Sequence, residues 1–324
     1  MSKRLTRIYA CGGAAINITA AQKDQHDQLG FSDLSVSRID TSDKNIKPGM
    51  SPNSVYILEN ADGSGKERKH NYKAIVASLE QILAMHKPGD YNIVMMSASG
   101  GSGSVIGPVI IGELLKRKIP VVALVVGTIG SETETQNSIN TLKSLAGVSE
   151  AQKAPLVMSY FPVNQHFDQR EVDKQVLTTM TLLLNLFDSK NIEIDYKDIV
   201  NFLNYTNIRN TRPGLVGLET YNDDELQTIA GTSPLSMASV FKDDNRPFLP
   251  VTPDYHATGT RDQDMKDERM QFNAHYVITS APVKMAFEDL NKRMKQITDQ
   301  QHTRGQNFNL LGDGDQGDDN GMFL

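Results

Sequence analysis

The sequence is poor in cysteine and has no excess of positive charge. Cys11 is the only cysteine among 324 residues, so no internal disulfide can form, and a reducing compartment is expected. A free thiol that ends an apolar strand is usually an inert core group. The formal net charge of −6 argues against a duplex-DNA-binding protein, because the surface of such a protein is normally basic.

Long apolar runs and metal-binding patterns are also missing. No run approaches the roughly 18 apolar residues of a membrane span. The amino terminus passes directly into a strand and a glycine turn, without the apolar stretch of a signal peptide. No group of His, Cys and carboxylate residues has zinc spacing, so the metal ligands stay unassigned. We therefore expect a cytoplasmic protein that binds neither membranes nor nucleic acid directly.

Strand-like and helix-like segments alternate through the first half of the chain. The runs "YNIVMMS" (91–97) and "PVVALVVG" (120–127) are apolar on both faces, as buried parallel strands are. This pattern predicts an α/β fold with a doubly wound parallel sheet. The expected strands are 5–11, 34–40, 53–60, 91–97, 120–127 and 155–163, and the expected helices are 14–28, 72–86, 103–118 and 136–145.

The second half predicts a long helix followed by a smaller unit. Residues 168–188 would form a helix of about 30 Å at 1.5 Å per residue. The segments "GLVGLET", "SVFKDD" and "AHYVITSA" suggest short strands of a second α/β domain. The predicted organisation is a nucleotide-binding domain at 1–167, a central helix at 168–190, a second domain at 191–281, a helix at 282–304 and an acidic tail at 305–324.

Two glycine-rich turns, "CGGAAIN" (11–17) and "SGGSGSVIGP" (99–108), each stand between a strand and a helix. Glycine lets backbone N–H groups approach an anion closely, and a helix amino terminus favours negative charge. Two such turns in one sheet predict a site for one polyphosphate held from two sides. The alternative is a pair of ordinary strand-to-helix turns.

The common phosphate and nucleophile fingerprints are absent from these turns. Gly101 and Gly103 would need a glycine at 106 for GxGxxG, but Ile106 stands there. "GSGKE" (63–67) lacks the Ser or Thr and the first glycine of a Walker motif. No GxSxG elbow occurs. Phosphate binding is therefore expected by a different scheme.

The residues resemble the tubulin and FtsZ superfamily of GTPases. "SGGSGSV" (99–105) is similar to the family signature GGGTGSG, with Pro108 three residues on, and "IDTSDKN" (39–45) resembles the family's second loop. "SETETQN" (131–137) lies where the ribose-contacting loop would be. The resemblance implies nucleotide contacts by Gly12, Gly13, Ala14, Asn17, Asp40, Thr41, Ser99, Gly100, Gly101, Ser102, Gly103, Ser104, Glu132, Asn137 and Asp173.

Among subfamilies the chain most resembles the bacteriophage tubulins of the PhuZ type. That resemblance implies a GTPase that uses GTP, GDP and Mg²⁺ and polymerises with itself into filaments. Such filaments would position phage DNA or the replication compartment in the host bacterial cytoplasm. A TubZ-like plasmid-segregation filament, a non-hydrolysing nucleotide switch and a metabolic enzyme that binds a dinucleotide are the alternatives.

Two acids after the central helix are the expected catalytic residues. In this family the loop after that helix caps the nucleotide of the next subunit, so Asp198 would orient the attacking water and Asp195 would assist. The alternative reading is a helix N-cap, and the two roles can coexist. Asp173 would accept from guanine N1–H and the 2-amino group, with Glu171 as a nearby competitor and a solvated acid as the alternative.

The acidic tail "GDGDQGDDNGMFL" (312–324) ends in apolar residues. Solvation alone would explain its composition. The resemblance implies instead that it grips the next subunit through Asp313, Asp315, Asp318, Asp319, Met322 and Phe323. For Glu132 and Asn137, plain loop and helix-capping roles are the alternative.

Overall fold

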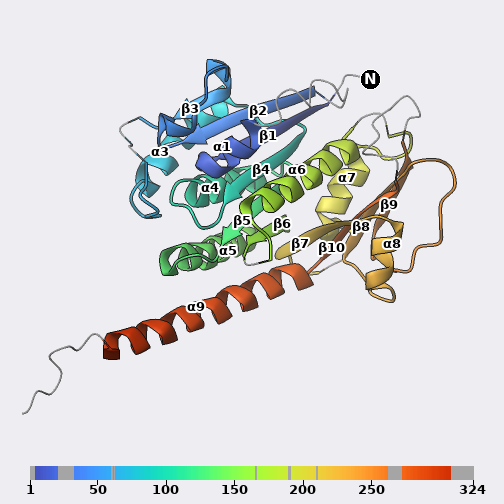
Figure 1. Ribbon diagram of the computed structural model, residues 1–324. Coiled ribbons are helices and arrows are strands. Elements are labelled where there is room, and N and C mark those ends of the chain that lie inside the picture. Colours follow the sequence, from blue (N-terminus) through green and yellow to red (C-terminus); the bar gives the residue numbers. More distant parts are fainter. Residues whose placement is uncertain are drawn as a thin grey trace, which may run out of the picture.

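The computed structural model describes residues 4–20, 33–59, 61, 63–164, 166–188, 191–208, 211–261 and 272–307. Ten strands form one sheet in the order β3-β2-β1-β4-β5-β6-β7-β10-β8-β9 (Figure 1). The strands are β1 (Leu5–Cys11), β2 (Asp33–Asp40), β3 (Val55–Ile57), β4 (Tyr91–Ser97), β5 (Val121–Thr128), β6 (Leu156–Val163), β7 (Leu215–Tyr221), β8 (Ser236–Phe241), β9 (His256–Thr260) and β10 (Ala274–Thr279).

The sheet changes character along its width. From β3 to β7 every neighbouring pair is parallel, which confirms the doubly wound parallel sheet. β10 is antiparallel to both β7 and β8, and β8 pairs with β9 in parallel. The strands predicted for a smaller second α/β unit therefore extend the same sheet through the antiparallel strand β10.

Helices cover both faces of the sheet (Figure 1). One apolar core lies between the sheet and α1, α6 and α7, and the other lies between the sheet and α3, α4, α5 and α9. The helices are α1 (Gly12–Ala20), α3 (Tyr72–Met85), α4 (Gly103–Lys116), α5 (Glu132–Gln152), α6 (Gln169–Leu186), α7 (Tyr196–Leu203), α8 (Asp223–Leu226) and α9 (Ala281–Asn307).

Three sequence expectations need correction. The helix expected at 136–145 spans Glu132–Gln152, because Ser131 and Glu134 form a capping box that starts it earlier. The last helix reaches Asn307, three residues into the expected tail. Strand β9, "HATGT", was not expected at all. The predicted helix 14–28 is described only to Ala20, and the rest of it lies outside the described residues.

A chain of hydrogen-bonded polar groups, with Ser239 and His275 buried, links β9, β8 and β10 to α8. The Ser239 hydroxyl lies 2.8 Å from His256 Nε2 and 2.9 Å from His275 Nδ1. His275 Nε2 lies 2.9 Å from the carboxylate of Asp223, the first residue of α8. Burial lowers the pKa of His256 to about 4, and burial also lowers the pKa of His275, although Asp223 opposes that shift. Both rings are therefore expected to be neutral at pH 7.

We expect the free energy of unfolding to fall as the pH drops from 7 to 5. Between its unfolded pKa near 6.5 and its folded pKa of about 4, His256 takes up a proton in the unfolded chain but not in the folded one. The loss at pH 5 from this residue is on the order of 2 kcal/mol. Urea unfolding at several pH values measures it. His256→Gln, which keeps an amide near Ser239, should flatten the profile, and an unchanged profile in that variant would contradict the assignment.

Candidate functional site

The two glycine turns meet at the carboxyl edge of the sheet. Gly12 follows β1 and has a positive φ of 79°, and a Cβ built on it would lie 2.7 Å from the backbone N of Gly103. A Cβ on Gly103 would collide with the carbonyl oxygen of Cys11. Only glycine allows this backbone approach. The starts of α1 and α4 are thereby brought together, and each helix start carries N–H groups without intrahelical acceptors.

The end of β2 adds polar groups to the same edge. The Asp40 carboxylate is buried and accepts hydrogen bonds from the Thr41 N–H at 2.8 Å and from Asn45 Nδ2 at 3.3 Å. Burial raises the pKa of Asp40, while these donors and the Ser102 hydroxyl oppose the shift. Asn45 Oδ1 in turn accepts from Asn17 Nδ2 at 3.2 Å. The amides and the buried acid therefore form one connected group beside α1.

Hydroxyl groups link the loop after β2 to the glycine turn after β4. Thr41 Oγ1 and Ser102 Oγ are 2.6 Å apart, and Ser102 Oγ donates to Ser64 Oγ at 3.2 Å. A Cβ on Gly101 would overlap Ser64. Ser64 belongs to the loop 63–71, which sequence reasoning dismissed as a failed Walker motif. Gly63 and Gly65 are the features of the sequence that indicate a tight turn here, and in the structure both glycines and Lys66 have a positive φ.

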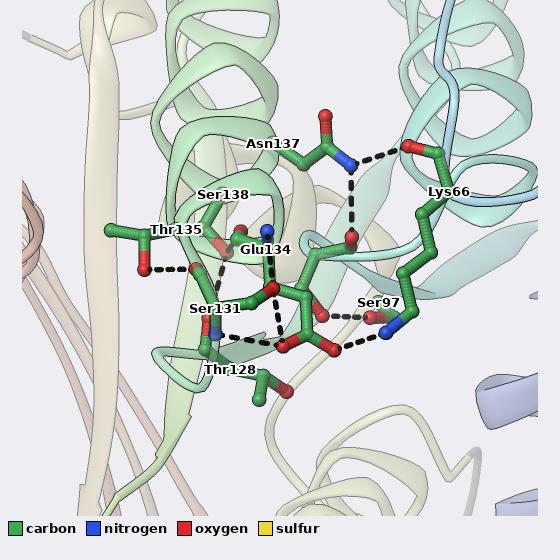
Figure 2. A network of polar contacts seen from close by, with 9 residues as sticks. Lys66, Ser97, Thr128, Ser131, Glu134, Thr135, Asn137 and Ser138 are labelled. Atoms are coloured by element: carbon green, nitrogen blue, oxygen red, sulfur yellow. Dashed lines mark hydrogen bonds and ion pairs between the residues drawn. The ribbon is translucent and has the colours of Figure 1, made fainter. Parts of the chain in front are cut away.

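The loop 63–71 is also fastened to α5 (Figure 2). Asn137 Nδ2 donates to the carbonyl oxygens of Lys66 at 2.8 Å and of Ser99 at 3.1 Å. The Lys66 ammonium lies 2.8 Å from the Glu134 carboxylate, which also accepts from the Ser131 backbone at 3.0 Å. The Lys66 ammonium lowers the pKa of Glu134. These contacts fix the loop 63–71 against the glycine turn that begins at Ser99.

Most of the predicted nucleotide-binding residues lie at this edge. The end of β2, the loops after β2 and β4 and the amino-terminal turns of α1 and α4 carry Gly12, Gly13, Ala14, Asn17, Asp40, Thr41, Ser99, Gly100, Gly101, Ser102, Gly103 and Ser104, and Asn137 joins them from α5. Glu132 is exposed and accepts a hydrogen bond from Gln301 of α9 at 2.7 Å. Asp173 lies in the second turn of α6 and accepts from Gln169 at 2.6 Å. The six predicted tail contacts, Asp313 to Phe323, lie outside the described residues.

The cradle fits a polyphosphate. A Cβ at Gly12 or Gly103 would collide with the backbone of the other turn, and a Cβ at Gly101 would overlap the Ser64 side chain, so glycine keeps the backbone accessible here. In the described part of the chain no three His, Cys, Asp or Glu side chains gather to hold a metal ion. Mg²⁺ is commonly held by phosphates, water and one or two carboxylates rather than by a protein cage. The buried Asp40 is a carboxylate available at this edge.

Asp195 and Asp198 lie at the opposite edge of the sheet. The Arg4 guanidinium, just before β1, is 4.6 Å from the Tyr196 ring, and Tyr91, the first residue of β4, is 5.6 Å from that ring. The cradle stands at the other ends of β1 and β4. A strand of seven residues spans roughly 23 Å, so neither acid can reach the cradle of its own chain.

The two acids form a capping box at the start of α7. Asp195 accepts from the Asp198 N–H at 3.0 Å, and Asp198 Oδ2 accepts from the Asp195 N–H at 2.9 Å. The expected N-cap role is therefore confirmed, and these backbone donors lower the pKa of Asp195. Asp198 Oδ1 accepts from the Tyr255 hydroxyl at 2.9 Å. Asp195 stays exposed and ionised at the end of the molecule.

Comparison with known proteins shows which proteins this chain resembles. No family model matches it. Within the described residues, no helix is both long and apolar enough for a bilayer crossing. The chain is 32% identical over 298 residues to a phage tubulin-like protein of Pseudomonas phage PhiPA3, which covers 92% of this chain and 91% of that one.

Solved structures agree with that relationship. The protofilament of TubZ from bacteriophage PhiKZ superposes with a TM-score of 0.84 at 29% identity, over 97% of this chain and 95% of that one. A phage tubulin PhuZ solved with GDP has the same fold, with a TM-score of 0.81 at 24% identity over 93% of each chain. The resemblance inferred from the glycine turns is confirmed, and the chain belongs to the family of phage tubulin-like proteins.

Proposed function

We propose that this protein is a GTP-dependent polymerising cytoskeletal protein that hydrolyses GTP where two subunits meet. The observation that carries the proposal is the separation of a phosphate cradle and an acidic pair onto opposite edges of one sheet. Neither edge alone has both the phosphate-binding turns and the acids that hydrolysis would need. Head-to-tail stacking brings the Asp195–Asp198 pair of one subunit onto the cradle of the next. The filament structures of related proteins support such self-association.

The nucleotide would bind across the cradle. Backbone N–H groups at Gly12, Gly13 and residues 100–104 would face the phosphates, and Asn17 and Asn137 would hold the loops that carry them. Asp173 would select guanine by accepting from its N1–H and 2-amino groups, for which adenine has no equivalent donor pair. A GDP-bound fold relative supports a guanine nucleotide. Bound Mg²⁺ would neutralise phosphate charge, with Asp40 as the candidate carboxylate.

Hydrolysis would use the neighbour's acids. Asp198 would accept a hydrogen bond from the attacking water and orient it toward the γ-phosphate, while its own orientation is held by the Tyr255 hydroxyl and the Asp195 N–H. The exposed Asp195 would assist through a second water. Because the acids arrive only with the next subunit, turnover would be activated by polymerisation, and GDP would then loosen the contact.

The proposed domain boundaries separate the segment that would bind nucleotide from the segment that carries the acids. Residues 1–167 would bind nucleotide, 168–190 would contain the central helix α6 (Gln169–Leu186), and 191–281 would carry the acids to the far edge. The chain ends with the helix that begins near 282 and the acidic tail. By its family, the filament would position phage DNA or the replication compartment in the host cytoplasm. A TubZ-like segregation role is the neighbouring alternative, and a dinucleotide enzyme is disfavoured by the absent GxGxxG pattern.

Right-angle light scattering on adding GTP and Mg²⁺ tests the proposal, with ATP and NAD in parallel and phosphate release measured alongside. Scattering should rise with GTP alone above a threshold protein concentration and decay as phosphate appears. Tight NAD binding without any rise would instead assign the cradle to a dinucleotide.

The tail of one subunit would bind a surface on the next. α9 has 27 residues, about 40 Å, and in Figure 1 it runs past α5 and away from the body. Between α3, α4 and α5 lies a groove of about 1010 Å³. Its lining is mainly basic and apolar, with one acid, Glu113, that pairs with Lys116, and it includes Arg68, Lys69, His70, Lys73, Val105, Pro108 and Val148. An acidic segment that ends in "MFL" matches both properties.

Deleting residues 308–324 should raise the critical concentration for assembly about tenfold or more, because the inter-subunit contact is lost while the cradle remains. The charge reversal Lys73→Glu with Lys116→Glu should have the same effect. Combined with the deletion it should add nothing, since both changes remove one interaction. Lys174→Glu on α6, on the other face of the sheet, is the matched control. Additive effects of deletion and groove reversal would place the tail elsewhere.

A further inference from the structure

The most exposed large apolar side chain stands on the edge that carries the acidic pair. Among the described residues the Phe248 side chain is 95% exposed. It belongs to the segment between β8 and β9, whose far end carries Tyr255, the partner of Asp198. An exposed aromatic ring held beside a subunit contact is the kind of residue that anchors an interface.

The segment is fastened at its base. Arg246 forms an ion pair with Glu193, which lies just before Asp195. The same guanidinium donates to Thr260 Oγ1 at 2.8 Å and lies 5.4 Å from the ring centre of Phe241. Phe248 follows Arg246 by two residues, so only a short stretch of chain separates it from the anchored ion pair that precedes α7.

A groove of matching character opens at the opposite edge of the sheet. It has a volume of about 1040 Å³ and lies between α9 and the carboxyl ends of β5 and β6. Thr128 and Val163, the last residues of these strands, form one wall. Phe167 and Met285 line the groove and are 42% and 62% exposed, although both are large and apolar.

We propose that Phe248 of one subunit inserts into this groove of the next subunit, beside Phe167 and Met285. The proposal rests on the head-to-tail stacking proposed above, which brings these two edges together. The groove carries both signs of charge, with Lys292 and Arg293 beside Asp289 and Glu219, and the exposed Asp244 near Phe248 would lie against the basic pair. The insertion would align the edge that carries Asp198 with the neighbour's nucleotide, so the contact would set the register of the active site.

Cysteine cross-linking in filaments tests this contact directly. Cys11, the single native cysteine, is fully buried, so introduced thiols react without interference. Under mild oxidation with GTP and Mg²⁺, the double variant Phe248→Cys, Met285→Cys should give a ladder of covalent oligomers on a non-reducing gel. Each single variant should give no ladder. The pair Phe248→Cys, Met85→Cys is the control, because Met85 is 48% exposed on α3, away from the groove.

Critical concentrations provide a second measurement. Phe248→Asp should raise the threshold for assembly about tenfold, whereas Phe248→Leu should stay within about twofold of the unaltered protein. Filaments of the double-cysteine variant without a ladder, or equal thresholds for the Asp and Leu variants, would overturn the docking and leave the proposed function standing. If the unaltered protein neither binds GTP nor assembles, the proposed function itself fails and the docking falls with it.

Discussion

Asp198→Ala is expected to bind GTP and assemble normally while hydrolysing GTP at least about 100-fold more slowly. The acid lies at the edge opposite its own cradle, so its loss leaves binding intact. The variant would lack the carboxylate that is proposed to orient water at the neighbour's γ-phosphate, and a positioned acid or base contributes about 10²–10⁴ in rate. Phosphate release from preformed filaments, together with GTP affinity of the monomer, separates the two effects.

The capping role of Asp198 requires controls. Asp198→Asn keeps an oxygen that can accept from the Asp195 N–H, so it should preserve the helix start and still lose turnover. Glu225→Ala removes the equivalent residue of the α8 capping box and should cost about 1 kcal/mol of stability without touching hydrolysis. Ordinary turnover in both Asp198 variants would sink the catalytic assignment, whereas loss in Glu225→Ala would point to a general stability effect.

Gly103→Ala is expected to abolish nucleotide binding, with a loss of affinity of about 100-fold or more. The added Cβ would collide with the Cys11 carbonyl oxygen and stand 3.2 Å from its carbonyl carbon. These are backbone atoms of β1, so no side-chain rotation can relieve the overlap. The two glycine turns would have to separate, and the cost in folding free energy should be roughly 1–3 kcal/mol.

A second glycine of the same helix supplies the control. A Cβ on Gly112 would lie 3.7 Å from Val148, an ordinary contact, and Ala is the better helix former. Gly112→Ala should therefore bind GTP normally and unfold at equal or higher urea concentration. Calorimetric titration with GDP and urea unfolding measure both quantities. Normal GDP affinity in Gly103→Ala would show that the closeness of the turns is not needed for binding.

Local sequence patterns were sufficient to predict the parallel half of the sheet. The continuous apolar runs of β4 and β5 can only be buried between two helical layers, and the glycine pairs mark where the chain turns from strand to helix. The order β7-β10-β8-β9 could not be predicted, because it depends on pairings between distant segments. β9 was missed since "HATGT" contains a glycine and one strongly polar ring, which belongs to the buried network with Ser239.

In the candidate site, too, local motifs could be predicted from the sequence, whereas contacts between distant segments could not. The turns that begin at Gly12 and Ser99 can be found as motifs in the sequence. The contribution of the loop with Ser64 and Lys66 cannot, because it depends on tertiary contacts: Ser102 donates to Ser64, and Asn137 donates to the backbone carbonyl of Lys66. The engagement of Glu132 by Gln301 likewise joins residues far apart in the chain. The resemblance to a known family supplied what spacing alone could not, namely the meaning of Asp195 and Asp198.

The two edges that would meet in the proposed stacking are the two ends of the same parallel strands. A pulling force along the proposed filament would therefore run along the covalent backbone of β1 and β4, and it would load their ladder of hydrogen bonds in shear, many at once. Peeling these bonds one by one would need a force across the strands, from the side of β3 or β9. In the proposed filament, each subunit would accordingly bear tension along the filament and yield first to a sideways load.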